Sequence, residues 1–484
     1  MSRSSSSVPI RPVAILALAC VAQLMLIVDD TIVNVALPTI GEELGFSESG
    51  LSWVVNAYFL TFGGFLLIGG RVADRVGPRR VFLLALAAFA LASAACGLAT
   101  DDVMLVVSRA IQGIAAAMLS PAALALILGS HAEGPARARA LAVWTSLLGI
   151  GAATGLLAGG ALTELLDWRW IFFINLPVAA VALLLVPRMV PADDLRSART
   201  SPNVAGATLG TLALLVLVFT VVETEHAGWT SARTLAGFGA AALLATLFAL
   251  GERRSASPLL PPALLRRRRP MIANGAVFLG AAGLMAMFFF QTLYLQRVLG
   301  WGALETGAAF LPFSIAMGTV SALMGKVVGR VDIRVLVGLG MGAAATGLLW
   351  MSSLTPTSDY ATHVAPSLAL TAAGLGAAFM PLMELATGGA EDRDGGLASA
   401  LLTTGQQIGG AIGIAAMVTI ATATTRDELA AGTAAPQALT DGFTHAFQIQ
   451  AGVLAAAGAL AVLLLGRAAA RRPAADVADA PSPA

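Results

Sequence analysis

The chain has 484 residues, of which 57% are hydrophobic and only 12% are charged, and its net charge is +1. A soluble domain carries about 25% charged residues, so a soluble globular class is excluded, and the near-neutral balance gives no indication of a nucleic-acid partner. The sequence contains no G-x-x-x-x-G-K-[ST] phosphate loop, no spacing typical of metal ligands and no cofactor motif, so an enzyme is not indicated.

Long apolar stretches alternate with short charged segments along the whole chain. Many of them exceed the roughly 18 residues that identify a bilayer-spanning helix. The ranges expected to be helices are, in chain order, 12–37, 50–70, 80–99, 104–129, 139–162, 170–190, 203–223, 233–251, 271–295, 304–327, 333–353, 365–389, 397–422 and 446–467. The sequence therefore predicts an all-α polytopic membrane protein with fourteen transmembrane helices.

The basic residues lie mainly on one side of these predicted helices. Loops after even-numbered helices, together with the two tails, hold 24 of the 29 basic residues; the other five are Arg109, Arg169, Arg233, Arg297 and Arg426. Cytoplasmic loops of membrane proteins carry an excess of Lys and Arg. We therefore expect a multi-pass protein of the cell inner (plasma) membrane with both termini in the cytoplasm.

Two polar segments suggest a division of the chain. The tract 191–202 and the four arginines at 266–269 bracket the seventh and eighth predicted helices. We expect an N-terminal six-helix bundle over 1–190, a linker with two inserted helices over 191–270, a second six-helix bundle over 271–467, and a cytoplasmic tail over 468–484. Arginine clusters beside a helix also bind anionic headgroups, so membrane lipids are expected partners.

A turn motif, GRVADRVGPRR, occupies residues 70–80 at the end of the second predicted helix. Glycine gives a tight turn its backbone freedom, and an aspartate there can accept hydrogen bonds from a helix N-terminus or an arginine. We expect a latch that holds one conformation and releases it in another. Its residues are Gly70, Asp74, Arg75, Gly77 and Arg79. A weaker copy, GKVVGRVDIR, spans 325–334 with Gly329 in place of the acid, and such repetition suggests duplicated bundles.

These residues resemble motif A of the major facilitator superfamily, and further motifs extend the resemblance. Residues 105–113 (LVVSRAIQG) are similar to the family's motif B. Residues 29–38 (DDTIVNVALP) and 168–177 (WRWIFFINLP) resemble hallmarks of its fourteen-helix drug:proton antiporter branch, and residues 406–413 (QQIGGAIG) resemble a later pattern. The resemblance, strong over helices 1–6 and looser over 9–14, implies the major facilitator fold and a multidrug or antibiotic efflux permease. We expect a monomer.

The antiporter motif of the fifth helix departs from the branch pattern. It usually reads G-P-x-x-G-G, whereas residues 155–160 read GLLAGG. Gly151, Gly155, Gly159 and Gly160 still favour close helix packing. Leu156 stands where the pattern has proline, so the expected kink is removed.

Three ionisable side chains fall within the predicted hydrocarbon region. Asp29 and Asp30 lie about 12–14 Å from the outer end of the first helix, and Arg109 lies about 8 Å into the fourth helix from the same side. Such charges are costly in a membrane and are usually functional, so we assign proton coupling to these three residues. The motif resemblance points to Asp29. Asp30 shares a helix face with Asn34, so the residues alone do not decide between the two acids.

Several polar residues are candidates for a substrate cavity. Glu384, just after Pro381, could attract a cationic substrate or carry a second proton, or it could be an interfacial acid. The glutamines could bind substrate or bond across helices. The candidate cavity residues are Asn34, Gln291, Glu384, Gln406 and Gln407.

The functional prediction is a secondary exporter in which proton entry drives efflux of a small hydrophobic or cationic compound by alternating access. One alternative is a facilitator or importer of a small metabolite, or a lipid flippase, with the same fold. Another is a non-transporting membrane sensor or scaffold. The acids in the first helix and the scarcity of other polar cavity residues favour a hydrophobic substrate over a sugar.

Overall fold

A computed structural model describes residues 12–131, 135–192, 203–255, 258, 266–328, 330–387 and 395–465. Within these ranges the regular structure is helical, apart from one β-bridge between Val328 and Val331. The first helices are α1 (Pro12–Leu44), α2 (Glu48–Val76), α3 (Pro78–Gly97), α4 (Asp102–Ser130), α5 (Pro135–Leu165), α6 (Trp170–Phe173) and α7 (Asn175–Met189). The next two are α8 (Val204–Ala227) and α9 (Ala232–Arg254).

The second half of the chain begins with α11 (Arg268–Leu293), which continues into a π-helical turn, η2 (Tyr294–Val298). The elements that follow are α12 (Ala303–Ala309), α13 (Leu311–Val327), α14 (Ile333–Met351), the π-helical turn η3 (Tyr360–Val364), α15 (Ala365–Thr387), α16 (Gly395–Ala430) and α17 (Ala435–Leu464). The π-helical turn η2 interrupts the regular hydrogen bonding of α11, a departure that is frequent at functional sites.

The described residues contain eleven helices long and apolar enough to cross a membrane. A twelfth is obtained if the two parts of α2, Gly50–Leu66 and Ile68–Val76, which meet at 52°, form one span. Helices also occur at the predicted ranges 139–162 (α5) and 203–223 (α8), where Thr208–Val221 is a shorter apolar segment. The all-helical membrane architecture is therefore confirmed, whereas the predicted count of fourteen spans is not.

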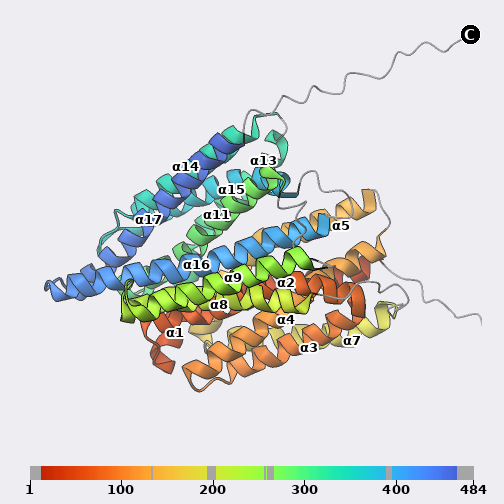
Figure 1. Ribbon diagram of the computed structural model, residues 1–484. Helices are drawn as coiled ribbons and strands as arrows, with labels where there is room; N and C mark the ends of the chain where they lie inside the picture. Colours follow the sequence, from red (N-terminus) through yellow and green to blue (C-terminus); the bar gives the residue numbers. More distant parts are fainter. Residues whose placement is uncertain are drawn as a thin grey trace, which may run out of the picture.

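The helices form two groups that meet at one end. In the first group α2 packs on α4, α1 on α5 and α3 on α4; in the second, α14 packs on α15 and α17, and α11 on α16. Figure 1 shows the group with α14, α15 and α17 leaning away from the first group toward the end at which α13 finishes. The two groups pack on one another along α2 and α16 and, at the opposite end, where α5 meets α12.

Two hydrogen bonds join the groups at this closed end. Gln296 Nε2 in η2 donates to the carbonyl oxygen of Val35 in α1 at 2.8 Å. The Leu304 N–H at the start of α12 donates to Glu164 Oε2 at the end of α5, at 2.7 Å. The ends of α1, α5 and α11 consequently lie on the same side of the molecule.

Helix α8 lies across the seam between the groups, against both α2 and α16. Thr419 Oγ1 in α16 donates to the carbonyl oxygen of Val221 in α8 at 3.2 Å. On the other side of α8, the rings of Phe219 and Trp53 in α2 are 6.3 Å apart. Helix α9 packs on α8 and exposes most of its apolar side chains, so this pair covers the α2–α16 seam from outside.

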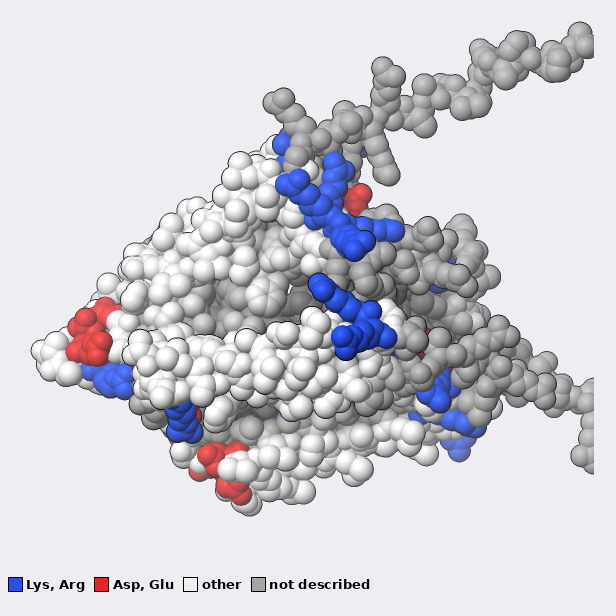
Figure 2. Space-filling model, in the orientation of Figure 1, with Lys and Arg blue, Asp and Glu red and all other residues white. Residues whose placement is uncertain are grey.

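Basic side chains gather at the end where the two groups diverge, and the surface is hollowed between them (Figure 2). At this end α9 finishes with Arg253 and Arg254, and α11 begins with Arg268 and Arg269. Acidic side chains gather at the opposite end, where some basic side chains lie beside them (Figure 2). The charge distribution is therefore polarised along the helix axes.

Candidate functional site

A buried ion pair joins α1 to α4. Asp29 Oδ2 lies 2.8 Å from Arg109 Nη1, and the two side chains are 0% and 1% exposed. Arg109 Nε donates to the carbonyl oxygen of Val54 in α2 at 3.0 Å, and its guanidinium carbon lies 4.2 Å from the ring centroid of Tyr58. The structure thus brings together two of the three residues that the sequence assigns to proton coupling.

The other oxygen of Asp29, Oδ1, accepts two more hydrogen bonds. Gln112 Nε2 in α4 donates to it at 2.8 Å, and Asn175 Nδ2 at the start of α7 donates at 2.7 Å. Asn175 also donates to Ser93 Oγ in α3 at 3.0 Å. Because a buried charge is tolerated when it is paired and hydrogen-bonded, this network accounts for a carboxylate that is fully shielded from solvent.

Sequence reasoning did not identify Gln112, Asn175 or Ser93 as partners of Asp29. Gln112 lies three residues after Arg109, and that spacing places the two on one helix face. Asn175 follows an apolar run in the WRWIFFIN segment, where an amide is unusual. These signals mark polar residues inside apolar helices, but they do not reveal which group each amide contacts.

Asp30 has different surroundings from its neighbour. Its Oδ1 atom is buried, and no hydrogen-bond partner for this atom occurs in the part of the chain that the structure describes. Asn34 does not bind the Asp30 carboxylate, because its Nδ2 donates to the backbone oxygens of Asp30 and Thr31, each at 3.3 Å. Asn34 therefore uses its amide on its own helix.

Three glycines of the antiporter motif pack against α1. A Cβ on Gly159 would lie 2.5 Å from the carbonyl oxygen of Ile32, and one on Gly155 would clash with Thr31 Oγ1. A Cβ on Gly151 would likewise meet a side chain of α1. The small residues thus let α5 lie directly on the segment of α1 that carries the two aspartates.

Gly160 and Leu156 face the second group of helices instead. A Cβ on Gly160 would lie 2.5 Å from the carbonyl oxygen of Ala303 in α12. Leu156 is buried, and its carbonyl oxygen would lie 2.5 Å from a Cβ on Gly307, which is also in α12. The position where the branch pattern has proline therefore lies at the α5–α12 contact, in a continuous α5.

The latch residues lie at the junction of α2 and α3: Gly70, Asp74 and Arg75 in the last turns of α2, Gly77 between the helices and Arg79 at the start of α3. Gly77 ends α2 with φ 102°, a conformation that favours glycine, and Pro78 begins α3. Arg79 Nη2 donates to the carbonyl oxygen of Pro187 in α7 at 2.9 Å. Asp74 and Arg75 are exposed, and Asp74 makes no hydrogen bond or ion pair among the described residues.

Near the end of α2, the close contact with α4 is made by Gly69 rather than by its neighbour Gly70. A Cβ on Gly69 would clash with the carbonyl oxygen of Ala117, whereas one on Gly70 would have only Pro121 nearby, at 4.0 Å. Gly70 therefore has room for a side chain.

The weaker copy of the latch motif contributes a helix cap. Gly329 lies outside the described residues. Asp332 caps α14, accepts the Arg334 N–H at 3.0 Å and pairs with Arg334 Nη2 at 2.9 Å. Hydrogen bonds from Arg334 hold the pKa of Asp332 below its ordinary value. This carboxylate is thus occupied locally, unlike that of Asp74.

The remaining candidate cavity residues are placed differently from one another. Gln291 in α11 is 0% exposed, and neither of its amide atoms has a partner in the described ranges. Gln407 in α16 is buried, with an unpartnered Nε2, and its Cβ lies 3.0 Å from the Cβ position of Gly63 in α2. Gln406 is half-buried, and Glu384 is exposed on α15.

Two further buried polar groups were not identified from the sequence. The Tyr58 hydroxyl in α2 and both amide atoms of Gln450 in α17 are buried without partners among the residues described. Such groups are rare in folded proteins. Gln450 lies within the predicted apolar range 446–467, so a glutamine inside an apolar helix was the feature that could have identified it from the sequence.

The WRW segment links the C-terminal end of α1 to the connection between α5 and α6. Trp168 Nε1 donates to Glu43 Oε2 at 2.6 Å, and Arg169 Nη1 lies 2.6 Å from Glu43 Oε1. The Arg169 guanidinium also lies over the Trp168 ring, 4.4 Å from its centroid. This cluster fixes the end of α1 to the α5–α6 corner.

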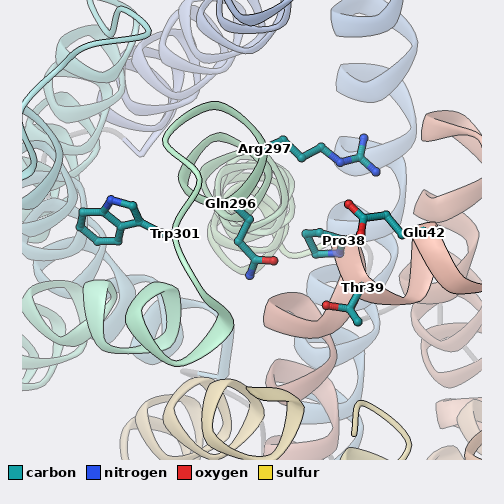
Figure 3. Close-up of a pocket in the computed structure, with 6 residues that line it drawn as sticks. All are labelled: Pro38, Thr39, Glu42, Gln296, Arg297 and Trp301. Atoms are coloured by element: carbon teal, nitrogen blue, oxygen red, sulfur yellow. The ribbon is translucent and has the colours of Figure 1, made fainter. Parts of the chain in front are cut away.

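A pocket of about 490 Å³ lies where the end of α1 meets η2. Figure 3 shows Arg297 extending toward Glu42 across this pocket, with Gln296 between α1 and the loop that carries Trp301. Its lining residues are Pro38, Thr39, Glu42, Gln296, Arg297 and Trp301. The pocket thus lies between the two groups of helices, at their closed end.

A family model described as Major Facilitator Superfamily matches residues 19–414. The chain belongs to the major facilitator superfamily. It is 39% identical over 447 residues to the puromycin resistance protein of Streptomyces alboniger, covering 92% of this chain and 88% of that one. It is 38% identical over 408 residues to the cephamycin export protein of Amycolatopsis lactamdurans, covering 84% of each. Membership places this major facilitator among membrane transporters rather than enzymes.

Solved structures share the fold. A bacterial homologue of the human lysosomal transporter Spinster, in an inward-facing and unoccupied conformation, has a TM-score of 0.67 and 17% identity, with 95% of this chain and 98% of that chain covered. A peptide transporter in complex with sulfate has a TM-score of 0.65 and 16% identity, with 95% and 96% covered. At these identities the likeness establishes the architecture of this major facilitator.

Proposed function

We propose that this major facilitator is a proton-coupled exporter of small hydrophobic or cationic drugs and antibiotics. Relatives named for puromycin resistance, cephamycin export and multidrug resistance support the substrate class. The observation that carries proton coupling is the fully buried ion pair between Asp29 and Arg109, hydrogen-bonded by Gln112 and Asn175. An ionisable pair at this depth is costly and is retained in membrane proteins for function.

The coupling step follows from the charge on Asp29. A proton on its carboxylate neutralises one member of the pair and leaves the Arg109 guanidinium buried without its counter-ion, which is strongly unfavourable. The contacts among α1, α3, α4 and α7 must then rearrange. Release of the proton restores the pair and the arrangement seen here, so proton binding and conformation are linked.

The proposed topology has fourteen spans with both termini in the cytoplasm. The basic end of the molecule then faces the cytoplasm, in line with the excess of Lys and Arg in cytoplasmic loops. Because the helix groups diverge at that end, the structure represents the inward-open member of an alternating-access cycle. Residues 1–190 and 271–467 form the moving bundles, 191–270 hold the inserted pair, and 468–484 form a cytoplasmic tail. We propose that a monomer among membrane lipids is the transporting unit.

The latch and the antiporter glycines are assigned to the conformational change. Asp74 is exposed and available in this inward-open arrangement, as expected of a latch that closes in the other state. Gly155 and Gly159 let α5 follow α1, while Gly160 packs on α12 and links α5 to the other bundle. A movement of the α1 segment that carries Asp29 and Asp30 is in this way transmitted through α5 to the closed end, where α5 meets α12.

The proposal is tested by ethidium accumulation in inside-out membrane vesicles. An acidic interior should drive ethidium uptake by the wild-type protein. Asp29→Asn should abolish the response to the gradient, and Asp427→Asn, an exposed acid near the end of α16, should leave it unchanged. Uptake that ignores the gradient would instead favour a facilitator or flippase, and uptake equal in Asp29→Asn and wild type would refute the assigned role.

A further inference from the structure

Two adjacent aspartates in α1 differ in how their carboxylates are used. Asp29 accepts hydrogen bonds from Arg109, Gln112 and Asn175, so both of its oxygens are occupied inside the first bundle. Asp30 has a buried oxygen without a partner among the described residues. One acid is therefore committed to the protein, and the other is available to a ligand.

Gln291 lies at the same level as Asp30 but on the second bundle. The hydrogen bond between Gln296 Nε2 and the carbonyl oxygen of Val35 aligns η2 with α1. Asp30 lies five residues before Val35 and Gln291 lies five residues before Gln296, which is about 7 Å in each helix. The two helices run in the same direction, since both end on the side of Glu164 and Leu304. The backbones of Asp30 and Gln291 are therefore at similar depth.

The face of α1 that carries Asp30 is turned toward the second bundle. At 100° per residue, Asp30 and Gly41 lie roughly 20° apart around the helix. The Cβ position of Gly41 is 3.5 Å from Arg297 Nη2, in the turn that follows α11. The face of Asp29, about 100° away, is turned toward α4 and α7 instead.

Tyr58 adds a third group at this level. Its ring lies under the Arg109 guanidinium, which pairs with Asp29, so its position in α2 matches that of the aspartates. Its hydroxyl is fully buried without a partner in the ranges described, as are both amide atoms of Gln291. A buried polar group without a partner costs about 1–3 kcal/mol, and a ligand that bonds to it recovers this cost.

We infer that Asp30, Tyr58 and Gln291 form a substrate site for an organic cation that also carries hydrogen-bonding groups. The Asp30 carboxylate pairs with the positive charge, while the hydroxyl of Tyr58 and the amide of Gln291 bind polar substituents. This inference rests on the proposed function and divides the work of the two acids. Asp29 exchanges the proton, and Asp30 recognises the substrate charge.

The test compares two dyes that share one ring system. Ethidium is a permanent cation, and its reduced form, dihydroethidium, is uncharged. Binding is measured with the purified full-length protein in lipid nanodiscs, under argon, for wild type, Asp30→Asn, Asp30→Glu and the control Asp427→Asn. Asp30→Asn should weaken ethidium binding at least tenfold and dihydroethidium binding less than threefold. Asp30→Glu, which keeps the charge, should recover most of the ethidium affinity, and thermal unfolding identifies any variant that fails to fold.

The outcomes separate this inference from the proposed function. Equal losses for both dyes in Asp30→Asn, or unchanged ethidium binding, would overturn the assignment of Asp30 while leaving proton-driven efflux intact. No ethidium binding by the wild-type protein would overturn both the substrate class and this site. Gln291→Leu gives a second check, because it should weaken binding of both dyes at least threefold without lowering thermal stability, and full retention of binding would contradict its role.

Discussion

The carboxylate of Asp29 is held by side chains from two other helices, and a third helix is attached through Ser93. Charges are rare in apolar helices, and each one in hydrocarbon requires a function or a partner. On this ground Asp29 and Arg109 were predicted from the sequence to be functional residues. Their amide partners could not be predicted, since an amide can donate or accept and bonds equally well to backbone, side chain or ligand. Asn34 and Asn175 illustrate this, because one bonds to its own helix and the other to the coupling acid.

Asn175→Ala should destabilise the protein and slow transport. It removes a hydrogen bond to a buried carboxylate, which is worth about 1.5–3 kcal/mol, and it also removes the hydrogen bond that Ser93 Oγ accepts. Thermal unfolding and gradient-driven ethidium uptake measure the two effects. Unchanged stability and unchanged uptake would show that the α7 contact is dispensable.

Gln291→Leu should stabilise the protein by about 1–3 kcal/mol, because leucine removes two buried polar atoms that have no partners. A residue that costs stability is expected where function requires it. Denaturant unfolding in detergent measures the change, with Gln437→Leu as a control whose side chain is hydrogen-bonded to Asp441. A loss of stability in Gln291→Leu would indicate that its amide has a structural partner.

At the level of the elements, α5 has two contact faces that the sequence did not separate. Gly151, Gly155 and Gly159 face α1, whereas Gly160 faces α12. The spacing of small residues predicts that another helix packs closely on α5. It does not predict which helix this is, because the partner is set by contacts between residues far apart in the sequence. The packing partners of α8 and α9 could not be predicted either, because a helix that is apolar all round has no polar stripe to mark its exposed side.

Gly159→Ala should disrupt the packing of α5 on α1. The new Cβ would lie 2.5 Å from the Ile32 carbonyl oxygen, which is backbone and cannot rotate away. Overpacking of this kind costs about 1–3 kcal/mol. The matched control is Gly129→Ala in α4, where nothing lies within 4 Å of the Cβ position. Thermal unfolding should separate the two variants, and equal melting temperatures would contradict the close approach.

At the scale of the molecule, apolar run lengths and basic-residue asymmetry predicted a helical membrane protein with paired bundles. They could not show that the bundles converge through Gln296 and Glu164, because these bonds join loops and helix ends distant in sequence. They also could not place α8 against both α2 and α16. Only the three-dimensional structure therefore shows that the two groups of helices diverge at the end where the basic side chains gather.

Cross-linking the closed end should stop transport. A double variant, Glu164→Cys with Leu304→Cys, places two thiols where α5 meets α12, while the native Cys20 and Cys96 are buried. A short bifunctional thiol reagent should abolish ethidium efflux in the double variant and leave each single variant active. Efflux that continues in fully cross-linked protein would exclude opening at this contact.

In the proposed mechanism, Asp29 couples proton movement to substrate movement. Its most direct test uses proteoliposomes that contain the purified protein and an internal pH dye, with an ethidium gradient imposed across the membrane. In the wild-type protein, ethidium flux should drive protons in the opposite direction, and Asp29→Asn should abolish this proton movement while the protein remains folded. Proton movement of wild-type size in Asp29→Asn, or none in the wild type during ethidium flux, would contradict this role of Asp29.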